Sequence, residues 1–488
     1  MPAKDFYVAI ELGSSKITGI AGQKKMDGSV TVIATATEEA AASIRKGIVY
    51  NIDKTSQAIR NIVQKLQNQL QTEIIRVHVG VGGQGIRSVL NTITSDLDQA
   101  TVISNAIADT MNDHNRSTQY PGQMILDVAT QEYRVDSQLQ IDPVGIECNR
   151  LEGNFLNIIW RESFYRNLNK CFEQQDMPQA YYYLAPMALA DSVLSDSERR
   201  SGCVLVDLGS GTTTVSVYYK NILRHMVTIP LGGDNLTKDI ASFHIDEAEA
   251  EKMKLKYAAA YTSPSEVDLD MKLSIDPNRS ILQRDFITMV EARTEEIIKN
   301  ALAQIPSEYA DKLMGGIILT GGMSCMKNME AAVRKYSNID KIRIARTVNI
   351  SVTSKPQNLV SEDGTMCTAI ALIAKADQLS SGRPLSEVNN LFSEEQPATH
   401  IDEETRPGGA FGPGKVPTGR ELRAKEEEEE RRRQEQEAKE AEERRLKEEE
   451  ERKRKEEEEQ KRRENSIGRK LMRGLKRIVS TVTEPEDE

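Results

Sequence analysis

Two segments about two hundred residues apart share one pattern, and this repeat limits the possible folds more than any other feature of the chain. The segments are Tyr7 to Ile20 (YVAIELGSSKITGI) and Val204 to Tyr218 (VLVDLGSGTTTVSVY). In each, a β-branched apolar strand ends in an acid, glycine and small hydroxyl residues follow, and then a second strand begins. The turn of such a hairpin exposes backbone N–H groups, and concavities of this kind bind anions, phosphate above all. The repeat therefore predicts two similar lobes that close on one nucleotide from opposite sides.

The residues expected to bind the phosphates or their Mg²⁺ lie in and beside the two turns. They are Gly13, Ser14, Ser15, Lys16, Asp207, Gly209, Ser210, Gly211, Thr212 and Thr213. The acids before the turns, Glu11 and Asp207, are positioned to hold a hydrated Mg²⁺ rather than to touch phosphate. One strand-Gly-Ser-strand hairpin is most often only a hairpin. It is the pairing, and the high density of glycine and hydroxyl residues in the second copy, that favours a nucleotide site.

A third element follows in residues 315–335 (GGIILTGGMSCMKNMEAAVRK). The pattern predicts a buried strand, a glycine pair and then a helix. Backbone without side chains at Gly321 and Gly322, with Met323 next to them, can lie flat against an adenine ring or its phosphates.

The order of these motifs resembles that of a known superfamily. A phosphate hairpin, a second phosphate hairpin and a glycine-pair adenosine motif occur in this order in the actin, sugar kinase and heat-shock chaperone ATPases. Residues 185–202 and 361–376 lie where that superfamily has its two connecting helices. The resemblance implies an α/β, two-lobed actin-like ATPase fold with ATP and Mg²⁺ as cofactors.

Residues 129–159 resemble the small α+β subdomain that is inserted in the FtsA family, the actin-like proteins of bacterial cell division. Gln131-Glu132-Tyr133, Asp136 and Pro143-Val144-Gly145 fall at the family positions, and the resemblance covers about residues 5 to 380. It implies self-polymerisation, binding of the C-terminal peptide of the tubulin-like FtsZ, and further division proteins as partners. It also implies a peripheral location on the cytoplasmic side of the bacterial inner membrane, at the division site.

The same resemblance assigns two further pairs of residues. Residues 244–258 are similar to the family helix that reaches the ribose, which implies that Glu251 and Lys254 lie near the sugar. Residues 285–305 match the helix on which the FtsZ peptide docks, with Arg293 and Lys299 as candidate contacts for an acidic peptide. An ordinary solvated helix surface stays open as the other interpretation of these two basic residues.

The sequence departs from the family pattern at Glu11, where the family usually has Asp. The extra methylene moves the carboxylate by about 1.5 Å, which could disturb the geometry of Mg²⁺ or of an attacking water. We therefore expect ATP binding with slow or negligible hydrolysis, with the nucleotide acting as a switch for assembly.

Gly80 to Gly85 (GVGGQG) satisfies the dinucleotide pattern G-x-G-x-x-G. The residues that follow, IRSVLNTIT, alternate like a strand, so the pyrophosphate would have no helix N-terminus to bind. These glycines are better explained as a bend of the chain into the inserted subdomain.

Composition excludes several classes of protein. The formal net charge of −11 argues against nucleic acid as the main partner. The five cysteines show no CxxC spacing, and the apolar surroundings of Cys203 and Cys325 predict buried thiols in a reducing cytoplasm. The N-terminus lacks a signal-peptide core, and no apolar run approaches the ~20 residues that a membrane span needs.

The tail has a different composition from the body. Residues 381–420 are rich in Gly, Pro and Ser and predict a flexible linker. Residues 421–464 are almost entirely Glu, Arg and Lys, without an apolar seam for a coiled coil. Pairs four residues apart favour one long charged helix, and a solvated disordered segment is the alternative.

Residues 465–483 predict an amphipathic helix that targets a membrane. The residues expected to enter the acyl boundary are Ile467, Leu471, Leu475, Ile478 and Val479. The residues expected to meet anionic headgroups are Arg469, Lys470, Arg473, Lys476 and Arg477. An ordinary helix that packs on a partner protein is the alternative, and the terminal position after a long spacer favours the membrane.

These patterns divide the chain into lobes. We expect the first lobe in residues 1–83 and 160–200, the inserted subdomain in 84–159, and the second lobe in 201–380, with a small subdomain at about 234–314. Together with these patterns, the resemblance to the FtsA family implies an ATP-binding scaffold that polymerises and anchors the FtsZ ring to the membrane. The alternatives are an actin-like scaffold of pilus assembly and, less well supported, a small-molecule kinase of the same superfamily.

Overall fold

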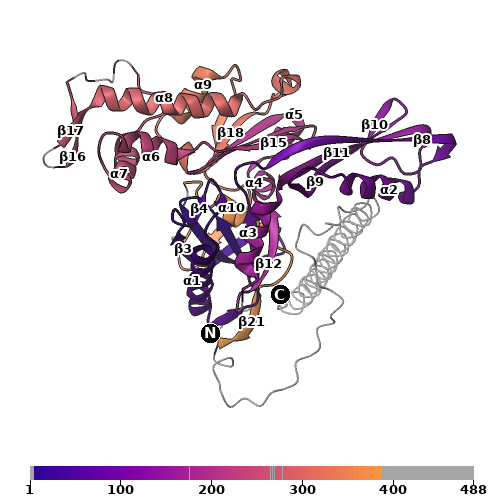
Figure 1. Cartoon of the computed structure of the whole chain (residues 1–488), viewed down its shortest axis with the longest axis horizontal. Coiled ribbons are helices and arrows are strands. Elements are labelled where there is room, and N and C mark those ends of the chain that lie inside the picture. Colours follow the sequence, from indigo (N-terminus) through magenta and orange to yellow (C-terminus); the bar gives the residue numbers. More distant parts are fainter. Residues whose placement is uncertain are drawn as a thin grey trace, which may run out of the picture. The chain divides into compact units, whose positions relative to one another are not determined.

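Two large β-sheets form the framework of the protein (Figure 1). The structure is a computed structural model that describes residues 5–385, except residues 175, 264, 266, 267, 269, 277, 278, 358 and 362. The first sheet has six strands in the order β12-β7-β1-β2-β3-β20, and the second has nine in the order β10-β9-β11-β8-β15-β14-β13-β18-β19. This α/β architecture agrees with the predicted two-lobed actin-like fold.

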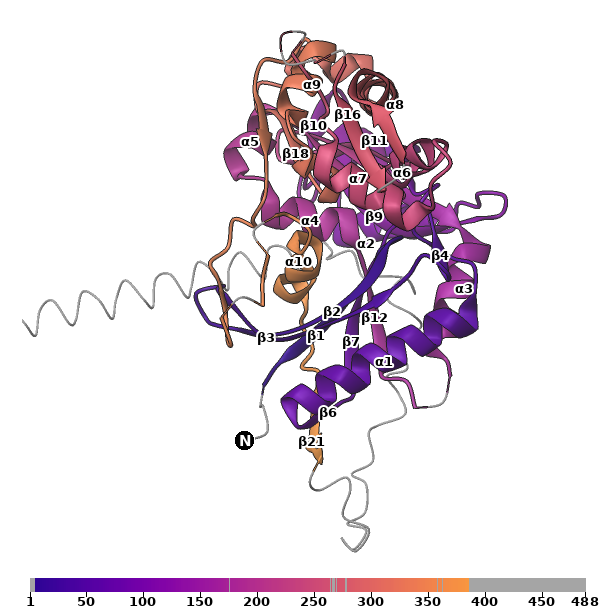
Figure 2. The same ribbon diagram turned by 90° about the vertical axis from the view of Figure 1, so that its left-hand side faces the viewer.

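The first sheet lies between helices on both of its faces (Figure 2). Its strands are β1 (Tyr7–Leu12), β2 (Lys16–Lys24), β3 (Val30–Glu39), β7 (Arg76–Val81), β12 (Gln179–Leu184) and β20 (Val352–Ser354). Its helices are α1 (Ile52–Leu70), α3 (Glu162–Phe172), α4 (Ala185–Val193) and α10 (Cys367–Lys375). Gly19 of β2 faces Ile62 of α1, whereas Gly22 of the same strand faces Ile373 of α10. Because successive strand residues alternate between faces, these contacts place α1 and α10 on opposite sides.

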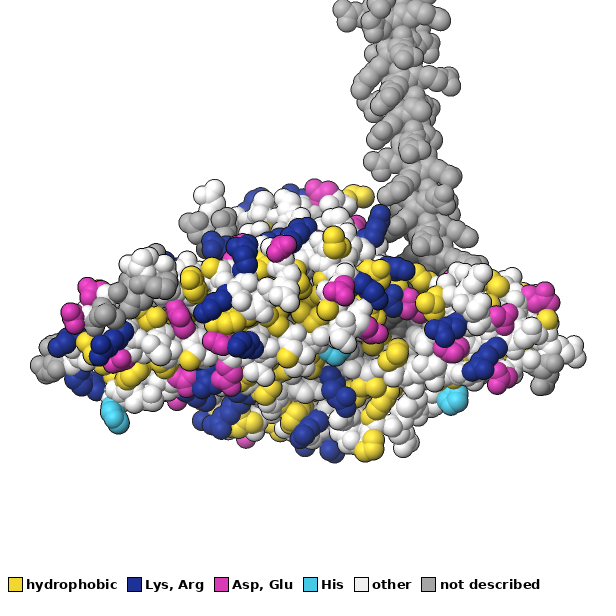
Figure 3. Space-filling view, turned by 90° about the horizontal axis from the view of Figure 1, so that it is seen from above, with side chains coloured by type: hydrophobic (Ala, Val, Ile, Leu, Met, Phe, Trp, Pro, Cys, Tyr) yellow, Lys and Arg dark blue, Asp and Glu magenta, His cyan; other side chains and the backbone are white. Residues whose placement is uncertain are grey.

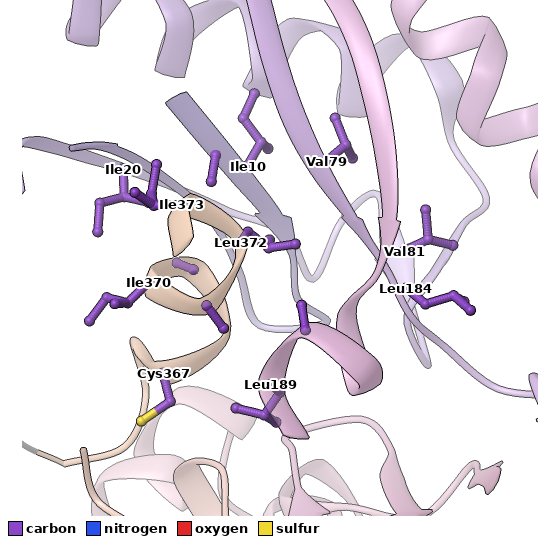
Figure 4. Close-up of a cluster of buried hydrophobic side chains, with 14 of the residues drawn as sticks. Ile10, Ile20, Val79, Val81, Leu184, Leu189, Cys367, Ile370, Leu372 and Ile373 are labelled. Atoms are coloured by element: carbon purple, nitrogen blue, oxygen red, sulfur yellow. The ribbon is translucent and has the colours of Figure 1, made fainter. Parts of the chain in front are cut away.

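Helix α10 closes the core of the first lobe. Its apolar residues, Ile370, Leu372 and Ile373 among them, pack with Ile10 of β1 and Leu189 of α4 (Figure 4). The assignment of all of residues 201–380 to the second lobe is therefore wrong for β20 and α10. The chain returns to the first lobe because β20 pairs in parallel with β3 and because α10 has an apolar face to bury against the first sheet.

The second sheet combines the second lobe with the inserted subdomain. Its strands are β8 (Arg87–Val102), β9 (Gln123–Val135), β10 (Gln138–Gln140), β11 (Glu147–Arg161), β13 (Cys203–Leu208), β14 (Thr213–Tyr219), β15 (Ile222–Ile229), β18 (Gly316–Thr320) and β19 (Ile342–Ile344). The long strand β8 confirms that a strand, not a helix, follows Gly85. The two parts join where β8 pairs with β15, at Arg87 and Val227.

Further helices and short strands complete the two lobes and the insert. The helices are α2 (Asn105–Arg116), α5 (Asp196–Ser201), α6 (Gly233–Ala241), α7 (Glu247–Tyr257), α8 (Gln283–Leu302) and α9 (Met329–Tyr336), with the 3-10 turns η2 (Ser307–Lys312) and η3 (Gly322–Cys325). The short strands are β4 (Ile44–Arg45), β5 (Ile48–Val49), β6 (Thr72–Ile74), β16 (Lys272–Asp276), β17 (Arg279–Leu282) and β21 (Ser381–Pro384). Val204 and Val206 of β13 share a core with Ile297 of α8 and Val333 of α9, so α8 and α9 cover one face of this sheet.

Two further expectations need correction. The linker does not begin at residue 381, because β21 pairs with β6 and the N–H of Leu385 donates to the carbonyl of Gln71. The thiol of Cys203 is buried as predicted, but Cys325 is exposed at the surface, where its Sγ lies against the carbonyl of Asp363.

Candidate functional site

The first hairpin forms as the sequence predicts. Strands β1 and β2 pair antiparallel, with Glu11 opposite Thr18, and leave Gly13, Ser14 and Ser15 as the first phosphate turn. This turn and Lys16, at the start of β2, lie in the wall of one cavity.

The second hairpin has the same construction in the second lobe. Strands β13 and β14 pair with Asp207 opposite Thr214, and residues 209–212 form the second phosphate turn, which is closed by a 2.9 Å hydrogen bond from the Gly209 N–H to the Thr212 carbonyl. All four of its residues line the same cavity. Thr213 does not line it. Its buried hydroxyl donates to the carbonyl of Leu231, and Thr214 faces the cavity instead, because neighbouring strand residues point to opposite faces.

The glycine pair lies beside the second hairpin. Strand β18 runs parallel to β13, which places Thr320 next to Asp207 and Gly321 directly over its carboxylate. A Cβ on Gly321 would be 2.4 Å from Asp207 Oδ1. Gly321 and Gly322 line the cavity, whereas Met323 is 7% exposed and belongs to the apolar core of the second lobe. The side chain of Met323 thus packs in this core, and contact of the residue with a cofactor stays a prediction.

The structure brings these segments together around a cavity of about 190 Å³. A larger cavity of about 380 Å³ lies by α7, β16 and α8. Its lining is mainly apolar, with Lys327, and includes neither a carboxylate nor a glycine. The smaller cavity is the candidate site, because it combines two anion-binding turns with acids.

The two acids of the cavity have perturbed pKa values. Burial, and then the nearby charge of Asp207, raise the pKa of Glu11 to about 7, against the lowering effects of Lys16 and of a hydrogen bond from Thr368. Burial raises the pKa of Asp207 to about 6. Two carboxylates that repel each other and have hydroxyl groups around them suit a hydrated divalent cation, because hard cations bind oxygen ligands and often keep their waters. The residues therefore fit the Mg²⁺ that the sequence predicts.

Glu251 and Lys254 lie next to the site but outside its wall. Lys254 Nζ donates to the hydroxyl of Thr237 at 2.9 Å and to the carbonyl of Gly233 at 3.3 Å, and it pairs with Glu251. Through these contacts α7 holds α6 in place. Whether the pair reaches a ribose stays a prediction.

Several residues of the wall were not predicted. They are Leu12, Thr18, Gly47, Gly80, Gly82, Gly83, Ala185, Pro186, Thr214, Thr320, Gly364, Thr365 and Thr368. The glycines of the dinucleotide-like segment were the available signal, since glycine allows close approach of backbone whether or not a dinucleotide is bound. The remaining wall residues meet the site through tertiary packing and have no local signature.

Both basic residues predicted for partner binding are on α8 and already have acidic neighbours. Arg293 pairs with Asp239 of α6 and with Glu296, and Lys299 pairs with Glu295. Acidic and basic side chains are interspersed over the described face shown in Figure 3. An acidic peptide on α8 would therefore compete with ion pairs that exist within the protein.

The predicted membrane helix, residues 465–483, and the charged segment before it, residues 421–464, lie outside the described residues. Among the helices of the described part, none has both the length and the apolar content that crossing a bilayer requires.

Comparison with known proteins shows the family to which this chain is similar. The family model for cell division protein FtsA matches residues 204–371, and the model for the SHS2 domain inserted in FtsA matches residues 83–159. The fold is also similar to a solved PilM–PilN type IV pilus biogenesis complex, with a TM-score of 0.50 and 13% identity over 77% of this chain and 99% of that one. At this identity the similarity concerns the fold alone.

Relatives in three bacteria carry the description cell division protein FtsA. The Porphyromonas gingivalis protein is 32% identical over 336 residues, which cover 67% of this chain and 70% of the relative. The Pseudomonas aeruginosa protein is 28% identical over 81% of this chain and 95% of the relative, and the Bacillus subtilis protein 26% identical over 72% and 81%. The chain therefore belongs to the FtsA family of cell division proteins.

Proposed function

We propose that this FtsA family member binds ATP·Mg²⁺ between its lobes, polymerises, and tethers the FtsZ ring to the cytoplasmic face of the membrane through its last helix. The observation that carries the nucleotide part is the meeting of two glycine-hydroxyl turns and two neighbouring acids in one cavity. In such a site the two turns suit phosphate and the two acids suit a hydrated cation.

The chain's own residues divide the work. Backbone N–H groups of the two phosphate turns would hold the phosphates, and Gly321 and Gly322 would lie against the adenosine. Glu11 and Asp207 would hold Mg²⁺ through water, and the bound ion would neutralise phosphate charge. Hydrolysis is slow or negligible in this proposal because Glu11 carries a longer side chain than the aspartate usual in the family, so nucleotide acts chiefly as a switch for assembly.

Docking of the FtsZ C-terminal peptide on α8 can be tested with Arg293. We expect the full chain to bind a fluorescent FtsZ C-terminal peptide, and Arg293→Glu to weaken binding about tenfold, as loss of a charged hydrogen bond does. Fluorescence anisotropy measures the affinity. The exposed Arg334 on α9 pairs with Glu330, so Arg334→Glu is a matched control that should leave affinity unchanged. Absence of peptide binding by the unaltered chain would contradict the proposal.

Membrane tethering can be tested by removing the last helix. The full chain should pellet with anionic vesicles, and a chain ending at residue 464 should stay in the supernatant, since each basic residue near such a surface contributes about 1 kcal/mol. Vesicles of neutral lipid are the control and should retain much less of the full chain. Equal pelleting of both chains with anionic vesicles would show that residues 465–488 are not the anchor.

A further inference from the structure

A third turn, between the two phosphate turns, is formed by Lys46 and Gly47 in the β4–β5 hairpin. Lys46 has φ 52° and Gly47 φ 72°, so the chain reverses through two left-handed residues. Nothing in its sequence, IRKGIV, distinguishes it from an ordinary surface turn. Its contacts distinguish it, because they reach three different elements around the cavity.

The first contact is with the first phosphate turn. The N–H of Gly47 donates to Ser14 Oγ at 2.8 Å, and Gly47 itself lines the cavity. An accepted bond leaves the hydroxyl proton of Ser14 free to donate elsewhere, since a hydroxyl has one proton and two lone pairs. The Lys46–Gly47 turn thus orients a side chain that is predicted to meet phosphate.

The second contact explains a glycine of the dinucleotide-like segment. A Cβ on Gly47 would lie 2.4 Å from Gly83 Cα, and a Cβ on Gly83 would lie 2.5 Å from the Gly47 carbonyl oxygen. The next residue, Gln84, donates its N–H to the carbonyl of Lys46 at 2.9 Å. Two backbones without side chains therefore pack directly together and fix the Lys46–Gly47 turn against the wall of the cavity.

The third contact crosses from the first lobe to the second. A Cβ on Gly211 of the second phosphate turn would lie 2.4 Å from Ser14 Oγ and 3.3 Å from Lys46 Cα, so the two phosphate turns touch here. Beyond this contact, the half-buried Lys46 side chain reaches α6, where its Nζ donates to Asn235 Oδ1 at 2.9 Å.

Helix α6 is itself fastened to the second phosphate turn. The N–H groups of Gly233 and Asp234 donate to the carbonyls of Gly209 and Ser210, at 3.1 and 2.7 Å. Asn235 Oδ1, besides accepting from Lys46, accepts from the Gly232 N–H and so caps the first turn of α6. A displacement of Asn235 would therefore also displace the second phosphate turn.

We propose that Lys46 is a positioning residue of the nucleotide site, which holds the second phosphate turn against the first by binding Asn235 across the cleft. Burial lowers the pKa of the Lys46 ammonium, and the charges of two nearby basic residues act in the same direction, whereas the charge of Asp234 raises it. The pKa is lowered overall, and the hydrogen bond to Asn235 offsets part of the cost of burying this charge. The proposal rests on nucleotide binding at this site, which is itself proposed above.

The test uses Lys46→Met in the full chain and has two readouts. In the nucleotide-free protein, hydrogen exchange at the Gly233 and Asp234 amides should become about tenfold faster, because α6 loses its hold from the first lobe. With a fluorescent ATP analogue and Mg²⁺, dissociation should become faster by a similar factor. Exchange in β1 and β2 should not change, which shows that the variant folds.

Matched variants separate the specific contact from the general effect of charge. Lys238→Met removes an exposed positive charge from the same helix and should leave both readouts at wild-type values. Lys46→Arg should retain them, and Asn235→Asp, which keeps the cap and adds an ion pair, should slow both. If Lys46→Met showed the hydrogen-exchange rate and the analogue dissociation rate of the wild type, the proposal would be overturned. If the unaltered chain failed to bind the analogue, nucleotide binding would be disproved, and the exchange readout alone would still decide whether Lys46 holds α6.

Discussion

At pH 8, Glu11→Gln should raise the Tm of the nucleotide-free protein by a few degrees, although it removes an ionisable group from the proposed binding site. The carboxylate is half-buried, lies close to Asp207, and has a pKa of about 7 in the folded protein against 4.5 for an ordinary glutamate. At pH 8 Glu11 is therefore charged, although the folded protein would be more stable with Glu11 in its neutral form. An amide of the same shape removes that penalty.

The sign of the pH dependence follows from proton counting. Between pH 4.5 and 7 the folded state holds more protons at Glu11 than the unfolded state does, so stability falls as pH rises through this window. The full shift corresponds to roughly 3 kcal/mol, and partial exposure to the cavity reduces our expectation to about 2 kcal/mol. The advantage of Glu11→Gln should therefore grow from pH 5.5 to pH 8 in thermal unfolding. Asp207→Asn should act in the same direction.

Added Mg²⁺ and ATP should reverse the order of the two proteins. Ligand that binds the folded state raises Tm by mass action, and the variant lacks one of the two charges that suit a divalent cation. The ligand-induced rise should therefore be smaller in Glu11→Gln than in the unaltered chain. Glu38→Gln is the control on the same sheet, because a hydrogen bond from Lys65 lowers the pKa of Glu38. This control should not raise Tm, and a lower Tm for nucleotide-free Glu11→Gln at pH 8 would contradict the account.

The features that the sequence predicted well are those that a short stretch of sequence determines. Each phosphate hairpin has its strands, its acid and its turn within about fifteen residues, so alternation and glycine placement suffice to predict it. Residues 352–385 show the limit. The parallel pairing of Val352 with Val30 and the antiparallel pairing of β21 with β6 join segments more than three hundred residues apart. The SSGRP segment that contains β21 has the composition of a linker.

The site shows the same division between local and tertiary information. Thr368 reaches Glu11 only because α10 folds back on the first sheet, and the acidic neighbour Asp239 of Arg293 comes from another helix. The side chain of Thr213 points away from the cavity that Thr214 lines, because a shift of one residue along a strand reverses the face. A glycine-rich segment marks a place of close approach, but its partner, here Gly47 against Gly83, appears only in three dimensions.

A second large effect is expected at the segment that connects the lobes, where Glu198→Gln should lower the free energy of unfolding by about 3 kcal/mol at pH 7. The Glu198 side chain is 9% exposed, receives hydrogen bonds from the N–H and hydroxyl of Ser195, and pairs with both Nε and Nη2 of Arg343. Arg343 also donates to the carbonyl of Val193, the last residue of α4, at 2.9 Å. One pair thus ties α4 and α5 to strand β19 of the second lobe.

The pH dependence of this pair distinguishes it from a surface contact. Burial alone would raise the pKa of Glu198, but the hydrogen bonds from Arg343 and Ser195 outweigh burial and hold it at about 2. The unfolded value is 4.5, so the contribution is complete above pH 4.5 and is lost as pH falls toward 2. Urea unfolding of the two proteins should therefore differ most at pH 7 and progressively less below pH 4.5. Glu330→Gln breaks the exposed pair with Arg334 and should cost less than about 0.5 kcal/mol. If Glu198→Gln cost no more than this control at pH 7, the Arg343 pair would not be what fastens the connecting segment to the second lobe.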